Sequence, residues 1–196
     1  MHILFVCTGN ICRSPTAERL TMAYAATRLD DATQLTAESA GTRAVYGSAM
    51  DPTAELVLSG LGGDGRNFQA RQINAEQVAA ADVILTMTRE HRSTVLNTSP
   101  RALSRTFTLR EAQALLETLP RSALSPADDL TRRCRELVAA MVRQRANRHT
   151  ARQRSDDIRD PIGADPATYL KVGEEIAATL NEWLDVVCGL ESVREE

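Results

Sequence analysis

A short segment near the amino terminus constrains the fold of this chain more than any other, because Cys7 and Arg13 are separated by only five residues. The apolar run over residues 3–6 predicts a buried strand before this segment. Ser14 and Pro15 predict a helix start after it, since proline is favoured in the first helical turn. A loop between a strand and a helix N-terminus presents N–H groups without internal partners, and the helix dipole adds positive potential. The segment therefore predicts an oxyanion-binding site.

Cys7 and Arg13 stand at the two ends of this loop. A thiol beside converging N–H donors and a guanidinium loses its proton easily, and an arginine can hold two phosphate oxygens at once. Gly9, Asn10 and Ser14 fall where such a loop needs a turn residue and hydrogen-bonding side chains. We therefore interpret Cys7 as a nucleophile, although a cysteine at the end of a strand is more commonly a small buried hydrophobe.

The run Cys-Thr-Gly-Asn-Ile-Cys-Arg-Ser-Pro, which begins at Cys7, resembles the signature of the low-molecular-weight protein tyrosine phosphatases. This resemblance implies a cysteinyl-phosphate intermediate and a general acid from a distant Asp-Pro loop. The catalytic residues that it implies are Cys7, Arg13 and Asp160. The phosphate-binding residues that it implies are Thr8, Gly9, Asn10, Ile11, Cys12, Arg13 and Ser14.

The remaining apolar pattern predicts strands that alternate with helices. The strands are expected near residues 3–6, 35–40, 82–87 and 105–109, and the helices near 16–28, 52–61, 74–81, 89–96, 110–119, 126–144 and 167–187. This order is typical of an α/β fold with a doubly wound open sheet of four parallel strands and helices on both sides. The resemblance implies the same three-layer fold, that of phosphotyrosine protein phosphatase I, in a single domain over residues 1–196.

Composition limits the partners that we expect. The net charge of −3 argues against nucleic acid, and no apolar run approaches the ~20 residues of a membrane span. Cys7, Cys12, Cys134 and Cys188 form no disulfide framework, which favours a reducing, cytoplasmic location. We expect no metal and no cofactor, because the loop itself supplies positive charge. We expect phosphorylated proteins and free oxyanions as ligands, and a monomer or weak dimer.

The sequence has three Asp-Pro pairs, which begin at Asp51, Asp160 and Asp165, and only one of these residues is expected to be the general acid. Asp51 precedes a helical pattern and is better explained as its N-cap. Asp160 precedes Pro161 in a loop, and the next helix already has Asp165 as its cap. We therefore predict that Asp160 is the acid, since proline biases its backbone toward an extended conformation that can hold a carboxyl over a leaving group.

Three residues are expected to support the loop. Ser14 is placed to stabilise the Cys7 thiolate, and the resemblance implies a hydrogen bond between Ser39 and Asn10. Ser39 can also be read as a turn former at the end of a strand. Relatives often carry a histidine near the position of Phe68, so part of the usual support is missing here.

Cys12 is the second thiol of the loop, and the resemblance implies a reversible disulfide with Cys7; a packed thiol is the alternative. Residues 120–157 form a charged helical insertion that relatives usually lack. Its basic part is either a solvated surface or a docking surface for an acidic protein.

The wall of the substrate crevice is expected to include Ile11, Tyr46 and Ile162. Tyr46 is either part of this wall or an incidental exposed aromatic. Many tyrosine phosphatases have an aromatic pair where this chain has Ile162 and Gly163. In lacking the aromatic pair, the chain resembles the branch that includes phosphoarginine phosphatases. Ile11, however, suits an aromatic ring better than a guanidinium. We therefore favour phosphotyrosine over phosphoarginine, and both over arsenate reduction or phosphate binding without catalysis.

Overall fold

The computed structural model describes residues 1–119, 124, 129–147 and 156–190. Four parallel strands form a sheet in the order β2-β1-β3-β4. They are β1 (His2–Cys7), β2 (Thr36–Gly41), β3 (Val83–Thr86) and β4 (Thr106–Thr108). The chain places β2 on one side of β1 and β3 on the other, so the strand order reverses at the carboxyl end of β1. Ligands of open α/β sheets bind at such a point, and Cys7 lies there, which confirms the predicted fold.

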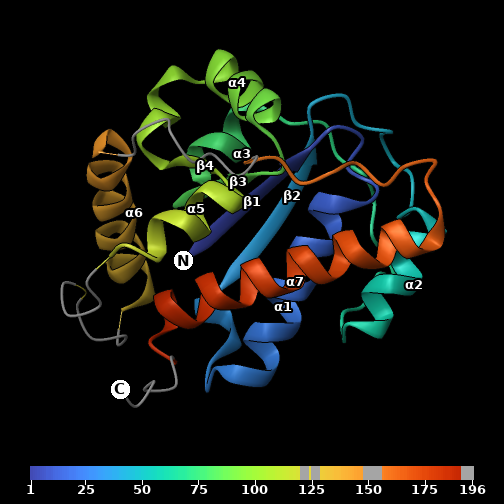
Figure 1. Cartoon of the computed structure of the whole chain (residues 1–196), viewed down its shortest axis with the longest axis horizontal. Helices are drawn as coiled ribbons and strands as arrows, with labels where there is room; N and C mark the ends of the chain where they lie inside the picture. The colour runs from blue at the N-terminus through green and yellow to red at the C-terminus, as the bar shows by residue number, and fades with distance from the viewer. Residues whose placement is uncertain (120–123, 125–128, 148–155, 191–196) are drawn as a thin grey trace.

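Helices cover both faces of the sheet (Figure 1). One face carries α1 (Arg13–Arg28), α2 (Pro52–Gly60), α5 (Leu109–Leu116) and α7 (Pro166–Cys188). The other carries α3 (Ala75–Ala80), α4 (Arg89–Thr98) and the 3₁₀ helix η2 (Pro100–Arg105). A short 3₁₀ turn, η1 (Ala32–Gln34), precedes β2. The arrangement is the three-layer fold that the sequence predicts.

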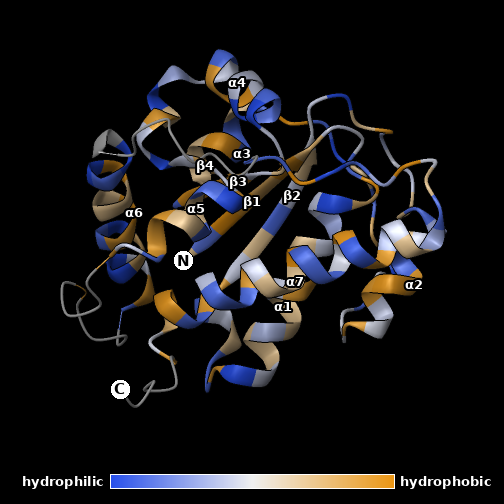
Figure 2. Ribbon diagram, in the orientation of Figure 1, coloured by the Kyte–Doolittle hydropathy of each residue, from blue (hydrophilic) through white to orange (hydrophobic). Residues whose placement is uncertain are grey.

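Alternating side chains of β1 explain why helices are needed on both faces. Ile3 and Phe5 point to the side of α1 and α7, and Leu4 and Val6 point to the side of α3 and α4. All four are fully buried. Figure 2 shows the resulting hydrophobic stripe along β1, which fixes the strand that ends in Cys7 at the centre of the molecule.

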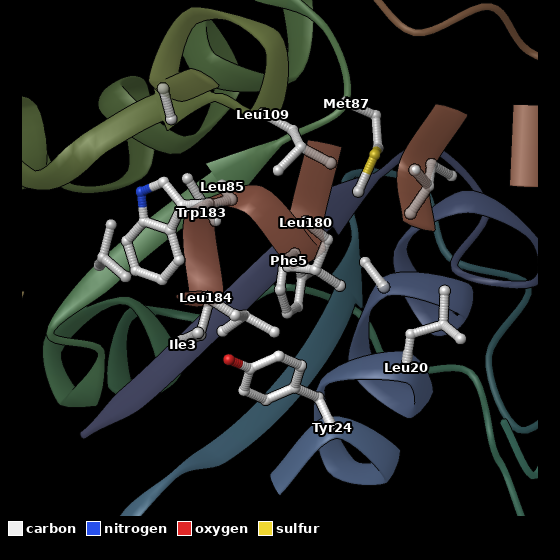
Figure 3. Close-up of a cluster of buried hydrophobic side chains, with 14 of the residues drawn as sticks. Ile3, Phe5, Leu20, Tyr24, Leu85, Met87, Leu109, Leu180, Trp183 and Leu184 are labelled. Atoms are coloured by element: carbon white, nitrogen blue, oxygen red, sulfur yellow. The ribbon is translucent and has the colours of Figure 1, made fainter. Parts of the chain in front are cut away.

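The larger core lies between β1, α1 and α7 (Figure 3). Phe5 faces Leu180 and Leu184 of α7, while Tyr24 of α1 closes the cluster from below. Trp183 is fully buried in the same cluster. Packing of this density holds the start of α1 in a fixed place relative to β1, so the loop between them is anchored at both ends.

The predicted helix caps are present. Asp51 accepts hydrogen bonds from the N–H groups of Thr53 and Ala54, which confirms it as a cap. Asp165 caps α7 in the same way, and the side chain of Thr88 caps α4. Leu170, an apolar residue within the helical pattern over 167–187, is 46% exposed, because the buried stripe of α7 runs through Tyr169, Val172 and Ile176 instead.

The predicted insertion contributes one described helix, α6 (Leu130–Asn147), which packs against α5, α7 and η2. The expected helix start at residues 125–128 and most of the basic run lie outside the described residues. Within the described part of the chain, no helix combines the length and the apolar character that crossing a membrane requires.

Candidate active site

The loop from Cys7 to Arg13, here called the phosphate loop, turns its carbonyl groups outward. The carbonyl oxygens of Cys7, Thr8, Gly9 and Ile11 accept hydrogen bonds from Thr42, Arg43, Val45 and Asp51, respectively. Among the described residues, no backbone N–H from Thr8 to Cys12 donates to another protein atom. With every one of these carbonyls held from outside, the N–H groups are left for a ligand on the inner side.

Two backbone features close the cradle. Asn10 has φ of 55°, the left-handed conformation that asparagine tolerates better than most residues, and it reverses the chain direction. Cys12 is the N-cap of α1 but makes no capping hydrogen bond with its side chain. The first N–H groups of α1 therefore remain unpaired and add the positive end of the helix dipole to the cradle.

Cys7 lies at the base of the cradle and is 2% exposed. Its Sγ is 2.9 Å from Ser14 Oγ, as the assigned role of Ser14 requires. Asn10 Nδ2 donates to Ser14 Oγ at 3.0 Å and to Ser39 Oγ at 2.8 Å. The expected bond between Asn10 and Ser39 is therefore present.

This hydrogen-bond network continues to two residues that the sequence analysis did not assign. Ser39 Oγ donates to Glu18 Oε2 at 2.5 Å, and Arg71 Nη2 donates to the same oxygen at 2.8 Å. The backbone N–H of Arg71 also donates to Asn10 Oδ1 at 2.7 Å. Phe68 is buried beside Arg71, with the guanidinium carbon 6.0 Å from the ring centroid. Glu18 and Arg71 thus hold Ser39 and Asn10 in place, which is the support that was missing in the sequence analysis because Phe68 stands where relatives often have a histidine.

A sequence signal for Glu18 does exist. It lies four residues after Ser14 in α1, so both side chains share one face of the helix. The contact with Arg71 carries no such signal, because it depends on how the segment after α2 folds back over the phosphate loop.

Asp160 reaches the same site from the far end of the chain. Its Oδ2 accepts a hydrogen bond from Arg13 Nη2 at 2.5 Å, and its side chain is 48% exposed. Arg13 Nη1 donates to the carbonyl of Ile158 at 3.0 Å, and Arg13 itself is 3% exposed. The N–H of Ile158 donates to the carbonyl of Met87, next to the end of β3. The structure therefore brings together Cys7, Arg13 and Asp160, as the sequence predicts.

His91 is a second residue that the sequence analysis left without a role. It is 4% exposed, and its Nε2 lies 2.8 Å from Thr8 Oγ1. Its Nδ1 lies 2.9 Å from Thr88 Oγ1, the cap of α4. Burial, assisted by the positive charge of Arg13, lowers the pKa of His91 to about 4, so the ring is neutral at pH 7. The contact between Thr8 and this neutral imidazole of α4 depends on the strand order. Local sequence does not reveal that order, so the role of His91 could not be predicted.

A cavity of about 330 Å³ opens over Cys7 and Arg13 and includes Asp160 in its lining. Ile11, Val45 and Ile162 supply its aliphatic wall, and Arg43 is also among its lining residues. Tyr46 is not among the lining residues; it is 81% exposed and borders a neighbouring hollow beside Arg19 and Arg71. Val45 thus occupies the place expected for Tyr46.

The other thiols differ from Cys7 in their surroundings. Burial raises the pKa of the Cys12 thiol far above its usual range. Burial also raises the pKa of Cys134 to about 12 and that of Cys188 to about 11. Arg135, next to Cys134, donates to Asp82, and the other oxygen of that carboxylate accepts from the N–H of His2 at the start of β1, the opposite end of the strand from Cys7. Cys188 is the last residue of α7.

No group of three or more His, Cys, Asp or Glu side chains within the described ranges is arranged to hold a metal ion. The positive charge that faces the cavity comes from Arg13, Arg43 and the start of α1. This arrangement can accommodate a dianion, with the sulfur of Cys7 and the carboxyl of Asp160 both facing the cavity.

Comparison with known proteins places these features in a family context. Residues 2–118 match the model of the low molecular weight phosphotyrosine protein phosphatase family. The low molecular weight protein-tyrosine-phosphatase Ptp of Acinetobacter johnsonii is 38% identical over 108 residues, which are 55% of this chain and 71% of that protein. A protein-arginine-phosphatase of Geobacillus stearothermophilus is 35% identical over 110 residues, 56% of this chain and 70% of that protein.

Similarity of fold extends over the whole chain. The solved structure of YwlE arginine phosphatase from Geobacillus stearothermophilus aligns with a TM-score of 0.68 at 24% identity, covering 100% of this chain and 97% of the other. The family match ends at residue 118, so both Asp160 and α6 lie beyond it.

Proposed function

The chain belongs to the low molecular weight phosphotyrosine protein phosphatase family, and we propose that it hydrolyses phosphotyrosine in proteins through a phosphoryl group carried on Cys7. The observation that supports this most is the meeting of Cys7, Arg13 and Asp160 at one cavity, although Asp160 lies 147 positions after Arg13 in the sequence. A site that only binds phosphate needs neither a nucleophile nor an acid.

In the first step the sulfur of Cys7 attacks phosphorus in line with the leaving oxygen. An S–P bond forms while the P–O bond to the tyrosine breaks, and Asp160 gives its proton to the departing phenolate oxygen. Arg13 and the N–H groups of the phosphate loop hold the three equatorial oxygens, which carry the transition-state charge. The short contact between Arg13 and Asp160 keeps the acid beside the phosphate.

In the second step water replaces the sulfur. Asp160, now a carboxylate, takes a proton from the attacking water, the S–P bond breaks, and its electron pair returns to Cys7. The hydroxyl of Ser14, 2.9 Å from Sγ, stabilises the thiolate as it leaves. Phosphate then dissociates and the resting enzyme is restored.

The cavity wall supports phosphotyrosine as the substrate group. Ile11, Val45 and Ile162 offer aliphatic contacts to an aromatic ring and no acceptor to a guanidinium. Arg43 in the lining adds a positive charge that disfavours a substrate guanidinium and favours acidic residues beside the phosphotyrosine. Phosphoarginine is the second candidate, because a relative of similar identity is named a protein-arginine-phosphatase.

A side-by-side assay of phosphotyrosine, phosphoarginine and phosphoserine peptides tests this choice. We expect the phosphotyrosine peptide to have the highest kcat/KM. A ranking led by phosphoarginine would overturn the substrate but leave the mechanism intact. The variant Asp160→Ala serves as the control for general acid catalysis, and its kcat should fall by about 10²–10⁴-fold.

Arsenate reduction is disfavoured by the position of the remaining thiols. A reductase must pass a disulfide from the nucleophile to resolving cysteines. Cys134 lies in α6 and Cys188 ends α7; both are buried, and neither lines the cavity over Cys7. Thiol-dependent turnover of arsenate by the purified protein would revive this alternative.

We also propose that Cys12 protects the nucleophile. When peroxide oxidises Cys7 to its sulfenic acid, the thiol of Cys12 can displace water and form a disulfide. The four cysteines are free and buried, which supports work in a reducing compartment such as the cytoplasm. Mass spectrometry of peroxide-treated protein should detect the linked peptides of Cys7 and Cys12, and their absence would end this proposal.

A further inference from the structure

We propose that Glu18 is a positioning residue that, together with Arg71, fixes the direction of every hydrogen bond between itself and Cys7, so that the Ser14 hydroxyl donates to the sulfur. The proposal rests on the proposed function, because it concerns the nucleophile of that reaction. It assigns a role in catalysis to a side chain that is separated from Cys7 by three intervening residues of the hydrogen-bond chain.

The direction is set at the Glu18 end. The Glu18 side chain is 6% exposed and forms an ion pair with Arg71 at 2.8 Å. A carboxylate has acceptors only. Ser39 Oγ lies 2.5 Å from Glu18 Oε2, so the single hydroxyl hydrogen of Ser39 must point to Glu18. Ser39 can then only accept from its remaining neighbour in the chain.

Asn10 is that neighbour, and its amide orientation is fixed from two sides. Nδ2 lies 2.8 Å from Ser39 Oγ and must donate, since Ser39 has no hydrogen left. Oδ1 accepts from the backbone N–H of Arg71 at 2.7 Å, which requires the same orientation. Arg71 therefore acts twice, once through its side chain on Glu18 and once through its backbone on Asn10.

The second hydrogen of Asn10 Nδ2 goes to Ser14 Oγ at 3.0 Å. Ser14 thus receives one hydrogen bond and keeps its own hydrogen to give. Cys7 Sγ, at 2.9 Å, is the near acceptor, while the carbonyl of Ala40 is at 3.5 Å. A hydroxyl that donates to sulfur stabilises the thiolate over the thiol, both for attack and as a leaving group.

A neutral amide at position 18 would remove this control. A glutamine side chain has the same shape but can present either an acceptor or a donor to Ser39. Ser39 could then turn its hydrogen to another partner, and only the backbone N–H of Arg71 would still hold Asn10, and through it Ser14, in the donating arrangement. The fold would keep its contacts, but the hydrogen-bond chain would be fixed at one point and no longer at two.

The test follows the rate at which iodoacetamide alkylates Cys7 as a function of pH, read by mass spectrometry of the Cys7 peptide, together with kcat and KM. For Glu18→Gln we expect the alkylation midpoint to move about one unit to higher pH, with kcat lower by about tenfold and KM little changed. Glu76→Gln, which removes an exposed carboxylate on the opposite face of the sheet, is the matched control and should behave as wild type.

A double-mutant cycle separates direction from general disruption. Ser14→Ala should show the same shift of midpoint, and adding Glu18→Gln to it should cause no further shift. Additive shifts, or an unchanged midpoint in Glu18→Gln, would overturn the proposal. Ser39→Ala interrupts the same series of hydrogen bonds by removing one oxygen. If Glu18→Gln does not fold, Ser39→Ala should show the same shift of the alkylation midpoint.

The outcome is independent of the test of function. If wild type hydrolyses phosphotyrosine but Glu18→Gln matches it in midpoint and kcat, the role of Glu18 fails and the phosphatase stands. If wild type hydrolyses no phosphopeptide, the function fails, and the alkylation profiles still decide whether Glu18 controls the sulfur.

Discussion

Arg13 shows at the scale of one residue why the chemistry depends on side-chain shape as well as charge. One nitrogen of its guanidinium holds the carbonyl of Ile158 and another holds the carboxylate of Asp160. The same planar group lines the cavity over Cys7. A single rigid fork therefore links the phosphate loop to the loop that carries Asp160.

Replacing Arg13 by lysine tests this directly. Lysine keeps the positive charge but cannot bind two partners in a fixed plane. We expect kcat/KM of Arg13→Lys to fall by about 10²-fold or more, the usual cost of losing a transition-state donor. Steady-state kinetics with a phosphotyrosine peptide measures it, and a variant with nearly normal kcat/KM would contradict the assigned role.

His91 leads to a prediction about pH. Its pKa falls from the usual 6.5 to about 4 in the folded chain because burial disfavours the charged ring. Between these two pH values His91 is protonated in the unfolded chain but stays neutral in the folded chain. The free energy of unfolding therefore decreases as the pH falls through this window. Urea unfolding at several pH values should show that the free energy of unfolding of His91→Gln decreases less on acidification than that of the wild type. The wild type's advantage over the variant should therefore shrink from pH 7 to pH 4, and a constant difference would refute the pKa.

At the scale of helices and strands, local sequence was sufficient where the signal is local. The caps Asp51, Thr88 and Asp165, the proline at the start of α1 and the apolar strands were all predictable, because each depends on neighbours in the chain. The partners of Glu18 and His91 were not, since they come from segments that only the sheet order brings together.

The contact between α2 and α7 gives a paired prediction at this scale. A Cβ on Gly173 of α7 would lie 2.4 Å from Val57 Cγ1, so the two helices could not keep their distance. Gly173→Ala should therefore destabilise the protein by about 1–3 kcal/mol. Gly60 at the end of α2 has no atom within 4 Å of the same position. Gly60→Ala should be neutral or stabilise by up to about 1 kcal/mol. Denaturant unfolding of both variants measures this, and an equal effect would contradict the packing.

For the molecule as a whole, the fold explains how residues far apart in sequence become one site. The switch point at the end of β1 sets the place of the phosphate loop, and α7 begins just after the loop that carries Asp160. The cradle and the position of Cys7 at its base were predictable from one motif. The aliphatic wall was less so: Val45 rather than Tyr46 lines the cavity, because adjacent loop residues point to different hollows.

At the same scale, contacts with α4 hold in place the loop that carries Asp160, here called the acid loop. Asp157 Oδ1 accepts from the N–H of Arg89, the first residue of α4, and Asp156 forms an ion pair with the Arg89 side chain. Because α4 also holds Thr8 through His91, one helix fixes both the acid loop and the phosphate loop. The site is therefore held together by the fold and not only by contacts among its own residues.

Trapping the intermediate tests the central claim most directly. Wild type and Cys7→Ser are mixed with a phosphotyrosine peptide, quenched within milliseconds, digested under conditions that preserve thiophosphate esters, and sequenced by mass spectrometry. We predict a phosphoryl group on the sulfur of Cys7 in the wild type, and no turnover by Cys7→Ser. A phosphoryl group on another residue, or steady hydrolysis by Cys7→Ser, would contradict the account.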